Sequence, residues 1–312
     1  RGFFQGLGTM MPSAVSQILE QIANAIVSVW AAYVLYNYGT KVGAVLGNAE
    51  NYAAAYGAAG GTLGTGTGAV VGLLFAAFVL LAYLSVFKRQ MKRERRAKVD
   101  SYSYIFKILF ITIIPVLMST TIYNCNAILD QAIFKNIANL QGYSANDISE
   151  WNGIYTGKYK TLINVPISIA SALAASSVPA LTAAYTNGKK EAVRSQINTA
   201  IRFIMVVAFP CAVGMGVLAS PILQLLFRDS SELAASMLQL GAVSIVFFSL
   251  STLSNGLLQG INRMREPVKN ALIALVLHIG LLVVLMYVFK LNIYAVVYAN
   301  AFFGLLMCVL NA

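Results

Sequence analysis

The sequence predicts an all-α membrane protein, a polytopic helical bundle with about eight transmembrane helices. Three observations lead to this prediction: 58% of the 312 residues are hydrophobic, only 11% are charged, and the mean hydropathy is +0.72. An ordinary soluble domain carries about 25% charged residues, so the composition argues against a soluble globular protein and against a disordered one. The net charge of +11 fits the cytoplasmic loops of a membrane protein, which collect Lys and Arg, better than it fits nucleic-acid binding.

Eight stretches are long and apolar enough to cross a bilayer, which takes about 20 residues of helix. Pro12 and Pro267 each open one of them, as suits a residue without an amide hydrogen in a first helical turn. Little of the chain lies outside these stretches, so we expect no soluble domain. The predicted spans are 12–36, 52–87, 105–134, 159–186, 197–226, 233–260, 267–289 and 293–312.

The predicted helix over 52–87 is crowded with glycine, much of it at a spacing of four residues. No Gly-Lys-Ser/Thr follows and no strand precedes, so a phosphate-binding loop is excluded. Small residues at this spacing let helix backbones approach closely in a membrane. We therefore predict a helix-packing face that includes Gly57, Gly60, Gly61, Gly64, Gly66, Gly68 and Gly72.

The basic run over 88–98 is the strongest marker of membrane orientation. If it is cytoplasmic, 16 of the 22 basic residues fall on the cytoplasmic side when each is counted with its nearest loop. The loops near 88–104, 187–196 and 261–267 are then all cytoplasmic. The run at 88–98 is also expected to attract anionic lipid headgroups.

Two short motifs recur near the two ends of the chain. RGFFQG at 1–6 is echoed by NGLLQG at 255–260, and YAAAY at 52–56 by YAVVY at 294–298. The first two helices thus match the last two in the same orientation, which implies a six-helix unit repeated in parallel topology. We expect residues 1–87 to hold the last two helices of an N-terminal lobe, 88–104 the linker, and 105–312 the six helices of a C-terminal lobe. The chain is then expected to be part of a larger protein.

Polar side chains follow one face on each of four predicted helices. Such faces avoid lipid, and a shared hydrated cavity explains four of them better than separate hydrogen-bonded seams do. Lys160 and Asp130 lie near the outer ends of their helices, where a side chain can also reach the interface. Arg202 is a secondary candidate near a cytoplasmic helix end. The predicted cavity residues are Gln17, Glu20, Asn24, Asn126, Asp130, Lys160, Asn164 and Asn255.

The remaining reactive residue types suggest no catalysis. His278 is the single histidine and has apolar helical neighbours, so we interpret it as a packed, satisfied side chain with a proton relay as the alternative. Cys125, Cys211 and Cys308 are far apart in apolar stretches and resemble buried hydrophobic residues more than disulfide or metal partners. No catalytic constellation and no metal site are predicted, and the protein is not expected to be an enzyme.

Several segments resemble bacterial polysaccharide-biosynthesis flippases of the multidrug/oligosaccharidyl-lipid/polysaccharide exporter superfamily, the relatives of stage V sporulation protein B and of lipid II flippases. The similar segments are RGFFQG at 1–6 with PSAVSQILEQ at 12–21, YKTLINVP at 159–166 with VPAL at 178–181, and LLQGINR at 257–263. The resemblance implies that this chain corresponds to helices five to twelve of about fourteen. It further implies two six-helix lobes around a central cavity and transport by alternating access. It also implies a bacterial plasma membrane location and an undecaprenyl-linked sugar as substrate. In lipid II flippases an arginine lies at the start of the eighth helix, and here Lys160 is expected to take its place, shifted by one residue.

The sequence therefore predicts a flippase for an undecaprenyl-linked oligosaccharide or peptidoglycan precursor. Lys160 is expected to attract the anionic headgroup. One alternative is a cation-coupled multidrug exporter of the same superfamily, with an ion site at Asp130, and another is a non-transporting membrane scaffold of envelope synthesis. No cofactor is expected beyond a coupling ion, for which Na⁺ and H⁺ both remain open.

Overall fold

The structure of the chain, a computed structural model, describes residues 1–7, 9–93 and 101–312, and all regular elements in these ranges are helical. The chain divides into two compact units, Arg1–Val99 and Asp100–Ala312. The boundary falls inside the segment 88–104 that we interpret as a linker, and residues 94–100 of that segment lie outside the described part.

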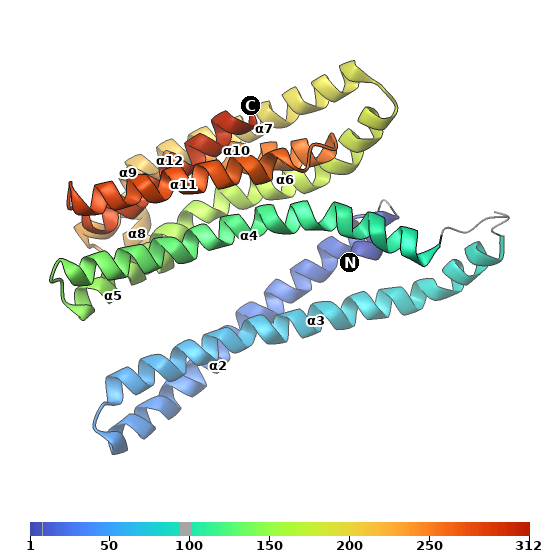
Figure 1. Cartoon of the computed structure of the whole chain (residues 1–312). Coiled ribbons are helices and arrows are strands. Elements are labelled where there is room, and N and C mark those ends of the chain that lie inside the picture. The colour runs from blue at the N-terminus through green and yellow to red at the C-terminus, as the bar shows by residue number, and fades with distance from the viewer. Residues whose placement is uncertain (8, 94–100) are drawn as a thin grey trace. The chain divides into compact units, whose positions relative to one another are not determined.

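The first unit is a helical hairpin. A short helix α1 (Gly2–Gly6) precedes the long helices α2 (Met11–Leu46) and α3 (Ala49–Arg93), which lie side by side (Figure 1). Pro12 sits in the first turn of α2, and Gly47 ends the helix with a left-handed φ of +78°. A residue without a Cβ atom adopts this conformation at little cost, which lets the chain reverse and begin α3 two residues later.

The predicted glycine face lies between α2 and α3. A Cβ atom on Gly64 would lie 2.6 Å from the carbonyl oxygen of Asn24, and one on Gly68 would lie 2.7 Å from that of Glu20. By contrast, Gly61 and Gly66 have nothing within 4 Å of such an atom. The close-packing prediction is therefore confirmed for the face that meets α2. Gly66 lies outside this face, whereas Gly61 contacts α2 through its carbonyl oxygen, which accepts a hydrogen bond from Ser28 Oγ at 2.9 Å.

The second unit is a bundle of long, roughly aligned helices with shorter ones at one end (Figure 1). Its elements are α4 (Tyr102–Leu140), α5 (Ala145–Ile154), a π-helical turn η1 (Tyr155–Tyr159), α6 (Lys160–Thr186), α7 (Lys190–Val217), α8 (Ala219–Phe227), α9 (Glu232–Gly241), α10 (Ser244–Gly260), α11 (Glu266–Tyr287) and α12 (Asn292–Asn311).

Seven helices among the described residues are long and apolar enough to cross a membrane, or eight if the pair α9 and α10, bent by 46°, makes one span. The prediction of an all-α membrane bundle is confirmed. Two predicted spans are interrupted. The span 233–260 is broken at the bend between α9 and α10, and the span 197–226 is broken where α7 ends at Val217 and α8 begins at Ala219. Pro221 accounts for the second interruption, because its ring would collide with the carbonyl of Val217 in a continuous helix.

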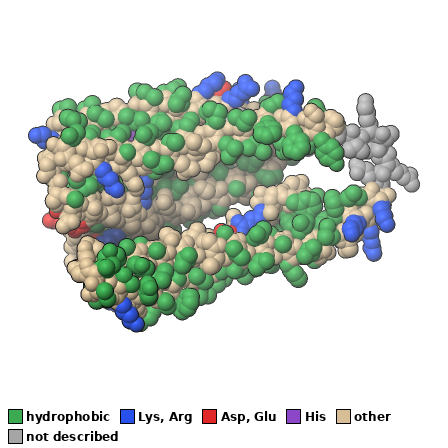
Figure 2. Space-filling model, turned by 60° about the horizontal axis from the view of Figure 1, so that its bottom comes forward, with side chains coloured by type: hydrophobic (Ala, Val, Ile, Leu, Met, Phe, Trp, Pro, Cys, Tyr) green, Lys and Arg blue, Asp and Glu red, His purple; other side chains and the backbone are tan. Residues whose placement is uncertain are grey.

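The surface of both units is strongly apolar. Figure 2 shows hydrophobic side chains over much of the visible face, and Trp30, Phe78, Phe110 and Val206 each expose more than 60% of their surface. Large contiguous apolar surfaces are rare on soluble monomers and suit helices whose solvent is lipid.

Among the described residues, the largest of three buried clusters in the second unit lies where α8 and α9 meet the ends of the long helices. Leu223, Met237 and Leu238 pack there with Met286 of α11 and Ile293 of α12. Because this core fixes α11 and α12 against α4 and η1, it also sets the positions of the polar side chains described next.

Candidate functional site

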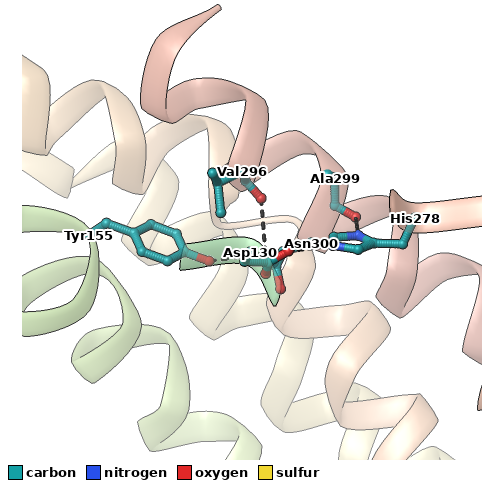
Figure 3. A network of polar contacts seen from close by, with 6 residues as sticks. All are labelled: Asp130, Tyr155, His278, Val296, Ala299 and Asn300. Atoms are coloured by element: carbon teal, nitrogen blue, oxygen red, sulfur yellow. Dashed lines mark hydrogen bonds and ion pairs between the residues drawn. The ribbon is translucent and has the colours of Figure 1, made fainter. Parts of the chain in front are cut away.

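A chain of buried polar side chains connects α4, α11, α12 and η1 inside the second unit (Figure 3). Asp130 of α4 lies between His278 and Asn300: His278 Nε2 is 2.6 Å from Asp130 Oδ1, and Asn300 Nδ2 donates to Asp130 Oδ2 at 2.7 Å. Asn300 Nδ2 also lies 3.0 Å from the hydroxyl oxygen of Tyr155 and 3.0 Å from the carbonyl oxygen of Val296. The chain of contacts thus runs from α11 to the π-helical turn.

These side chains are almost completely shielded. The exposed fraction is 0% for His278, 1% for Asp130 and 6% for Asn300. A buried ionisable group is costly unless it is paired and hydrogen-bonded, and here both carboxylate oxygens and both ring nitrogens have partners.

The contacts of His278 show how many protons the His278–Asp130 pair holds. Its Nδ1 faces the carbonyl oxygen of Ala299 at 2.8 Å, and a carbonyl can only accept, so Nδ1 carries a hydrogen. The contact between Nε2 and Asp130 Oδ1 needs one more hydrogen, which belongs either to the ring or to the carboxyl group. In both assignments the pair as a whole is neutral and shares one proton.

A cavity of about 250 Å³ opens beside this network. Lys160 contributes the single cation of its lining, and its Nζ atom lies 5.1 Å from the centre of the Tyr155 ring, within range of a cation–π interaction. Phe248 and Phe303 supply an apolar wall. The polar lining residues are Asn126, Tyr155, Tyr159, Lys160, Asn164, Ser244, Thr252 and Asn300.

The π-helical turn η1 orients the side chains at one wall of the cavity. Tyr155 and Tyr159 stack with ring centres 5.3 Å apart, and the Tyr159 hydroxyl lies 3.5 Å from Ser244 Oγ. A π-helical turn has more residues per turn than an α-helix and often occurs at functional sites. Here it places Tyr155, Tyr159 and Lys160 along the cavity, whereas Lys158 is not part of the cavity lining.

Lys158 instead ties the turn to the loop between α8 and α9. Its Nζ atom lies 2.5 Å from Asp229 Oδ2, and the other carboxylate oxygen accepts the backbone N–H of Ser231 at 2.9 Å. The hydrogen bond from Lys158 is the main cause that lowers the pKa of the Asp229 carboxyl group. The two lysines therefore have different roles: Lys158 in the turn is paired with Asp229, whereas Lys160 directly after it has no ion-pair partner among the described residues.

The structure brings some of the sequence-predicted site residues together. Lys160, Asn126 and Asn164 line the same cavity, and Asp130 lies directly behind Asn300 of its wall. Asp130 does not extend to the interface, which was the alternative considered from sequence, because His278 and Asn300 hold it inside the bundle.

Two other candidates of the second unit lie elsewhere. Asn255 accepts a hydrogen bond from Asn311 Nδ2 at 2.8 Å, so it joins α10 to α12 and does not line this cavity. Arg202 borders a different cavity together with Arg194 and Thr199 of α7.

The remaining three candidates belong to the first unit. Glu20 forms an ion pair with Arg1, whose Nε also donates to Ser16 at 2.6 Å. Asn24 accepts from Ser28 at 3.0 Å and packs against α3. Gln17 is exposed. Within this unit, Glu20 and Asn24 thus make local contacts.

Sequence reasoning missed Tyr155, Tyr159 and Asn300 and did not pair His278 with Asp130. Asn300 could have been noticed as an amide inside an otherwise apolar span. Tyr155 and Tyr159 are four residues apart directly before Lys160, a spacing that places two side chains on one helical face. In residues 1–7, 9–93 and 101–312, no group of three or more His, Cys, Asp or Glu could hold a metal ion.

Comparisons with solved structures identify the fold. The chain superposes on a crystal structure of MATE in the bent conformation with a TM-score of 0.70 and 16% identity, over 99% of this chain and 62% of that one. It also superposes on an inward-facing conformation of a multidrug resistance MATE family transporter of the MOP superfamily, with a TM-score of 0.68 and 14% identity, over 99% and 64%. At these identities the likeness shows the fold alone.

Comparisons of sequence identify the family. The chain is 27% identical to lipid II flippase MurJ of Bacillus subtilis (strain 168), over 90% of this chain and 50% of that protein. It is 23% identical to stage V sporulation protein B of the same organism, over 91% and 51%. The chain spans about half the length of the curated relatives it matches. The superfamily predicted from sequence is confirmed, and the chain is a multi-pass bacterial membrane protein. Because the family model for lipid II flippase MurJ matches residues 9–311, nearly the whole sequence, the chain belongs to the MurJ lipid II flippase family.

Proposed function

We propose that the protein moves a lipid-linked peptidoglycan precursor of the lipid II kind across the bacterial plasma membrane. Family membership supports this activity, and the observation that carries it is the cavity containing the Lys160 ammonium group. Among the described residues, no carboxylate lies within ion-pair distance of Lys160. Its charge is therefore available to an anionic ligand.

The chemistry of the lining fits the headgroup of such a precursor. A pyrophosphate needs cationic donors, and charge-assisted hydrogen bonds are the strong ones. The amides of Asn126 and Asn164 offer both donors and acceptors to sugar hydroxyls. We propose that Lys160 contacts the pyrophosphate while the two amides contact the sugars.

The proposed transport cycle uses the two parallel halves predicted from the repeat, which rock against each other around a fixed site. In this cycle the loops near 88–104, 187–196 and 261–267 face the cytoplasm, where the precursor is loaded. The basic run at 88–98, of which 94–98 lie outside the described residues, is proposed to contact anionic lipids on that side.

The test is a flipping assay in proteoliposomes with a fluorescent lipid-linked precursor, with the variants made in the gene that carries this sequence. Losing one charge-assisted contact costs about 1.5–3 kcal/mol, so K160Q is expected to lower the flipping rate by roughly 10- to 100-fold. K160R keeps the charge and should retain most of the activity. K158Q, two residues away but paired with Asp229 outside the cavity, is the matched control and should remain near the wild type.

The outcomes separate the proposed function from the alternatives. Unchanged flipping in K160Q would contradict the role of Lys160. No flipping by the wild-type protein, together with silent cavity substitutions in cells depleted of their own flippases, would favour the non-transporting scaffold.

A second candidate function, a cation-coupled multidrug exporter, is favoured by the buried Asp130 carboxyl group between α4, α11 and α12. This candidate predicts dye efflux from cells that D130N abolishes, whereas the flippase predicts no dye efflux. Measuring dye efflux and precursor flipping for the same protein therefore distinguishes the two functions.

For energy coupling, we propose H⁺ as the cation. Both oxygens of Asp130 already face nitrogen donors, and a shared proton completes the contact with His278, whereas Na⁺ requires oxygen ligands. The other titratable groups near this carboxyl are Tyr155 and Lys160. Flipping driven by a pH gradient in Na⁺-free proteoliposomes, and abolished in D130N, is the expected result. Flipping that requires a Na⁺ gradient would contradict it.

A further inference from the structure

A second cavity lies at the junction of α6 and α7, at the opposite end of α6 from Lys160. It has a volume of about 330 Å³, and its lining comes from the end of α6 and the first two turns of α7. The lining combines three cationic side chains with three that are apolar or aromatic: Lys189, Lys190 and Arg194, with Tyr185, Val193 and Ile197.

The three cations have no acidic partner in the described part of the chain. No carboxylate there lies within ion-pair distance of Lys189, Lys190 or Arg194. Glu191, their neighbour in sequence, borders the adjacent cavity of α7 together with Arg194 and Arg202 and is absent from this lining. Three exposed cationic side chains that no described carboxylate neutralises therefore border a cavity whose own surface is almost entirely apolar.

The cavity lies beside two candidate membrane spans. Two candidate spans, Ala145–Thr186 and Lys190–Val217, meet at this junction, so the cavity lies where helices leave the bilayer. Val193 and Ile197 lie one turn apart on α7 and lead from the charged end into the span. A ligand that fills the cavity is thus expected to be anionic at one end and apolar at the other.

We propose that this cavity takes up part of an acyl chain of an anionic phospholipid along Val193 and Ile197, with the phosphate of the lipid at the border of the cavity against Lys189, Lys190 and Arg194. Basic pockets between transmembrane helices are suited to such headgroups, and the volume falls in the range of small-molecule sites. A soluble phosphate would leave the apolar wall unused. The positive charge of the 187–196 loop predicts the cytoplasmic leaflet as the source of this lipid.

The experiment measures lipid binding to the full chain by native mass spectrometry in a non-ionic detergent. The probes are dioleoylphosphatidylglycerol, dioleoylphosphatidylcholine and inorganic phosphate. The triple variant K189Q/K190Q/R194Q removes the three charges of the cavity. The matched control K41Q/K135Q/K290Q removes three exposed lysines elsewhere and changes the net charge equally.

The expected result is tight binding of one phosphatidylglycerol molecule to the wild type, weakened on the order of 100-fold in the K189Q/K190Q/R194Q variant and by less than about threefold in the control. Phosphatidylcholine should bind weakly and equally to all three proteins. A phosphatidylglycerol affinity unchanged in the triple variant, or lowered equally in both variants, would overturn the proposal.

Two further outcomes would also overturn it. If inorganic phosphate displaces phosphatidylglycerol at comparable concentration, the site binds soluble anions. If a lipid-linked precursor displaces it from this cavity more effectively than phosphatidylglycerol itself does, the site belongs to the transport pathway. Loss of lipid binding with flipping retained would separate this proposal from the proposed function.

Discussion

The Nε2 atom of His278 lies 2.6 Å from Oδ1 of Asp130, and both side chains are buried between helices that are distant in sequence. The single histidine of the chain thus has the Asp130 carboxyl group as its partner. The other ring nitrogen, Nδ1, already carries the hydrogen that it donates to the carbonyl oxygen of Ala299. The proton that the pair shares therefore lies in the contact between Nε2 and Asp130 Oδ1.

We predict strong energetic coupling between these two residues. In a double-mutant cycle with D130N and H278Q, the interaction energy in thermal unfolding should be about 1–3 kcal/mol, because each single change leaves a buried partner unsatisfied. The control is the exposed pair Lys269 and Glu266, at 3.4 Å on the surface of α11, whose cycle should give about 0.5 kcal/mol or less. Equal values for the two cycles would show that burial of the pair has no energetic consequence.

The pair of Lys158 and Asp229 should give a pH-dependent contribution to stability. The pKa of Asp229 is lower in the folded than in the unfolded protein, so its stabilising effect is complete above the unfolded value of about 4 and is lost as the pH falls through the folded value. D229N should therefore lower the stability by about 1 kcal/mol or less at pH 7.

The measurement is the melting temperature of wild type, D229N and K158Q in detergent between pH 3 and 7. The difference between wild type and either variant should shrink toward pH 3. A difference of the same size at pH 3 and pH 7 would mean that the ion pair is not its cause.

The helices of this protein were predictable because a bilayer imposes a length and an apolar composition on each of them. The glycine face was predictable for a similar reason. Close approach of two helix backbones requires small residues at a spacing of four, and Gly60, Gly64 and Gly68 have this spacing. The same four-residue spacing includes Gly61, where an added Cβ atom would meet nothing within 4 Å. Spacing gives a helical phase but does not say at which positions the neighbour leaves no room for a Cβ atom.

The site was predictable only as a set of polar faces. Asn126 and Asn164 reach one cavity, but Asn255, chosen by the same criterion, bonds to Asn311 instead. Partner identity depends on how helices pack, and the sequence pattern does not contain it. The π-helical turn adds a second obstacle, since it changes the phase just before Lys160 and separates the roles of Lys158 and Lys160.

The glycine face gives a third prediction. In G68A the new Cβ atom would lie 2.7 Å from a backbone oxygen of α2, so the hairpin must separate or shift. Overpacking costs about 1–3 kcal/mol, which exceeds the gain of about 1 kcal/mol from replacing a helical glycine by alanine. G66A, two residues away with open space around it, should keep that gain and be at least as stable as the wild type. Unfolding of both variants in mixed detergent is the measurement, and a more stable G68A would contradict the packing of this face.

The last prediction concerns the ring beneath Lys160. Y155F removes only the hydroxyl group that faces Asn300, which keeps its contacts with Asp130 and Val296, so the loss should be below about 1 kcal/mol. Y155L also removes the aromatic face under the Lys160 ammonium group, worth about 0.5–2 kcal/mol. If that ring holds the cation in place for the headgroup, Y155L should raise the precursor concentration for half-maximal flipping by roughly 2- to 30-fold, and Y155F should raise it by less. Melting temperatures of the two variants check that both are folded. Equal effects on flipping would assign the role to the hydroxyl group and its contact with Asn300, and the cation–π contact would then have no part in transport.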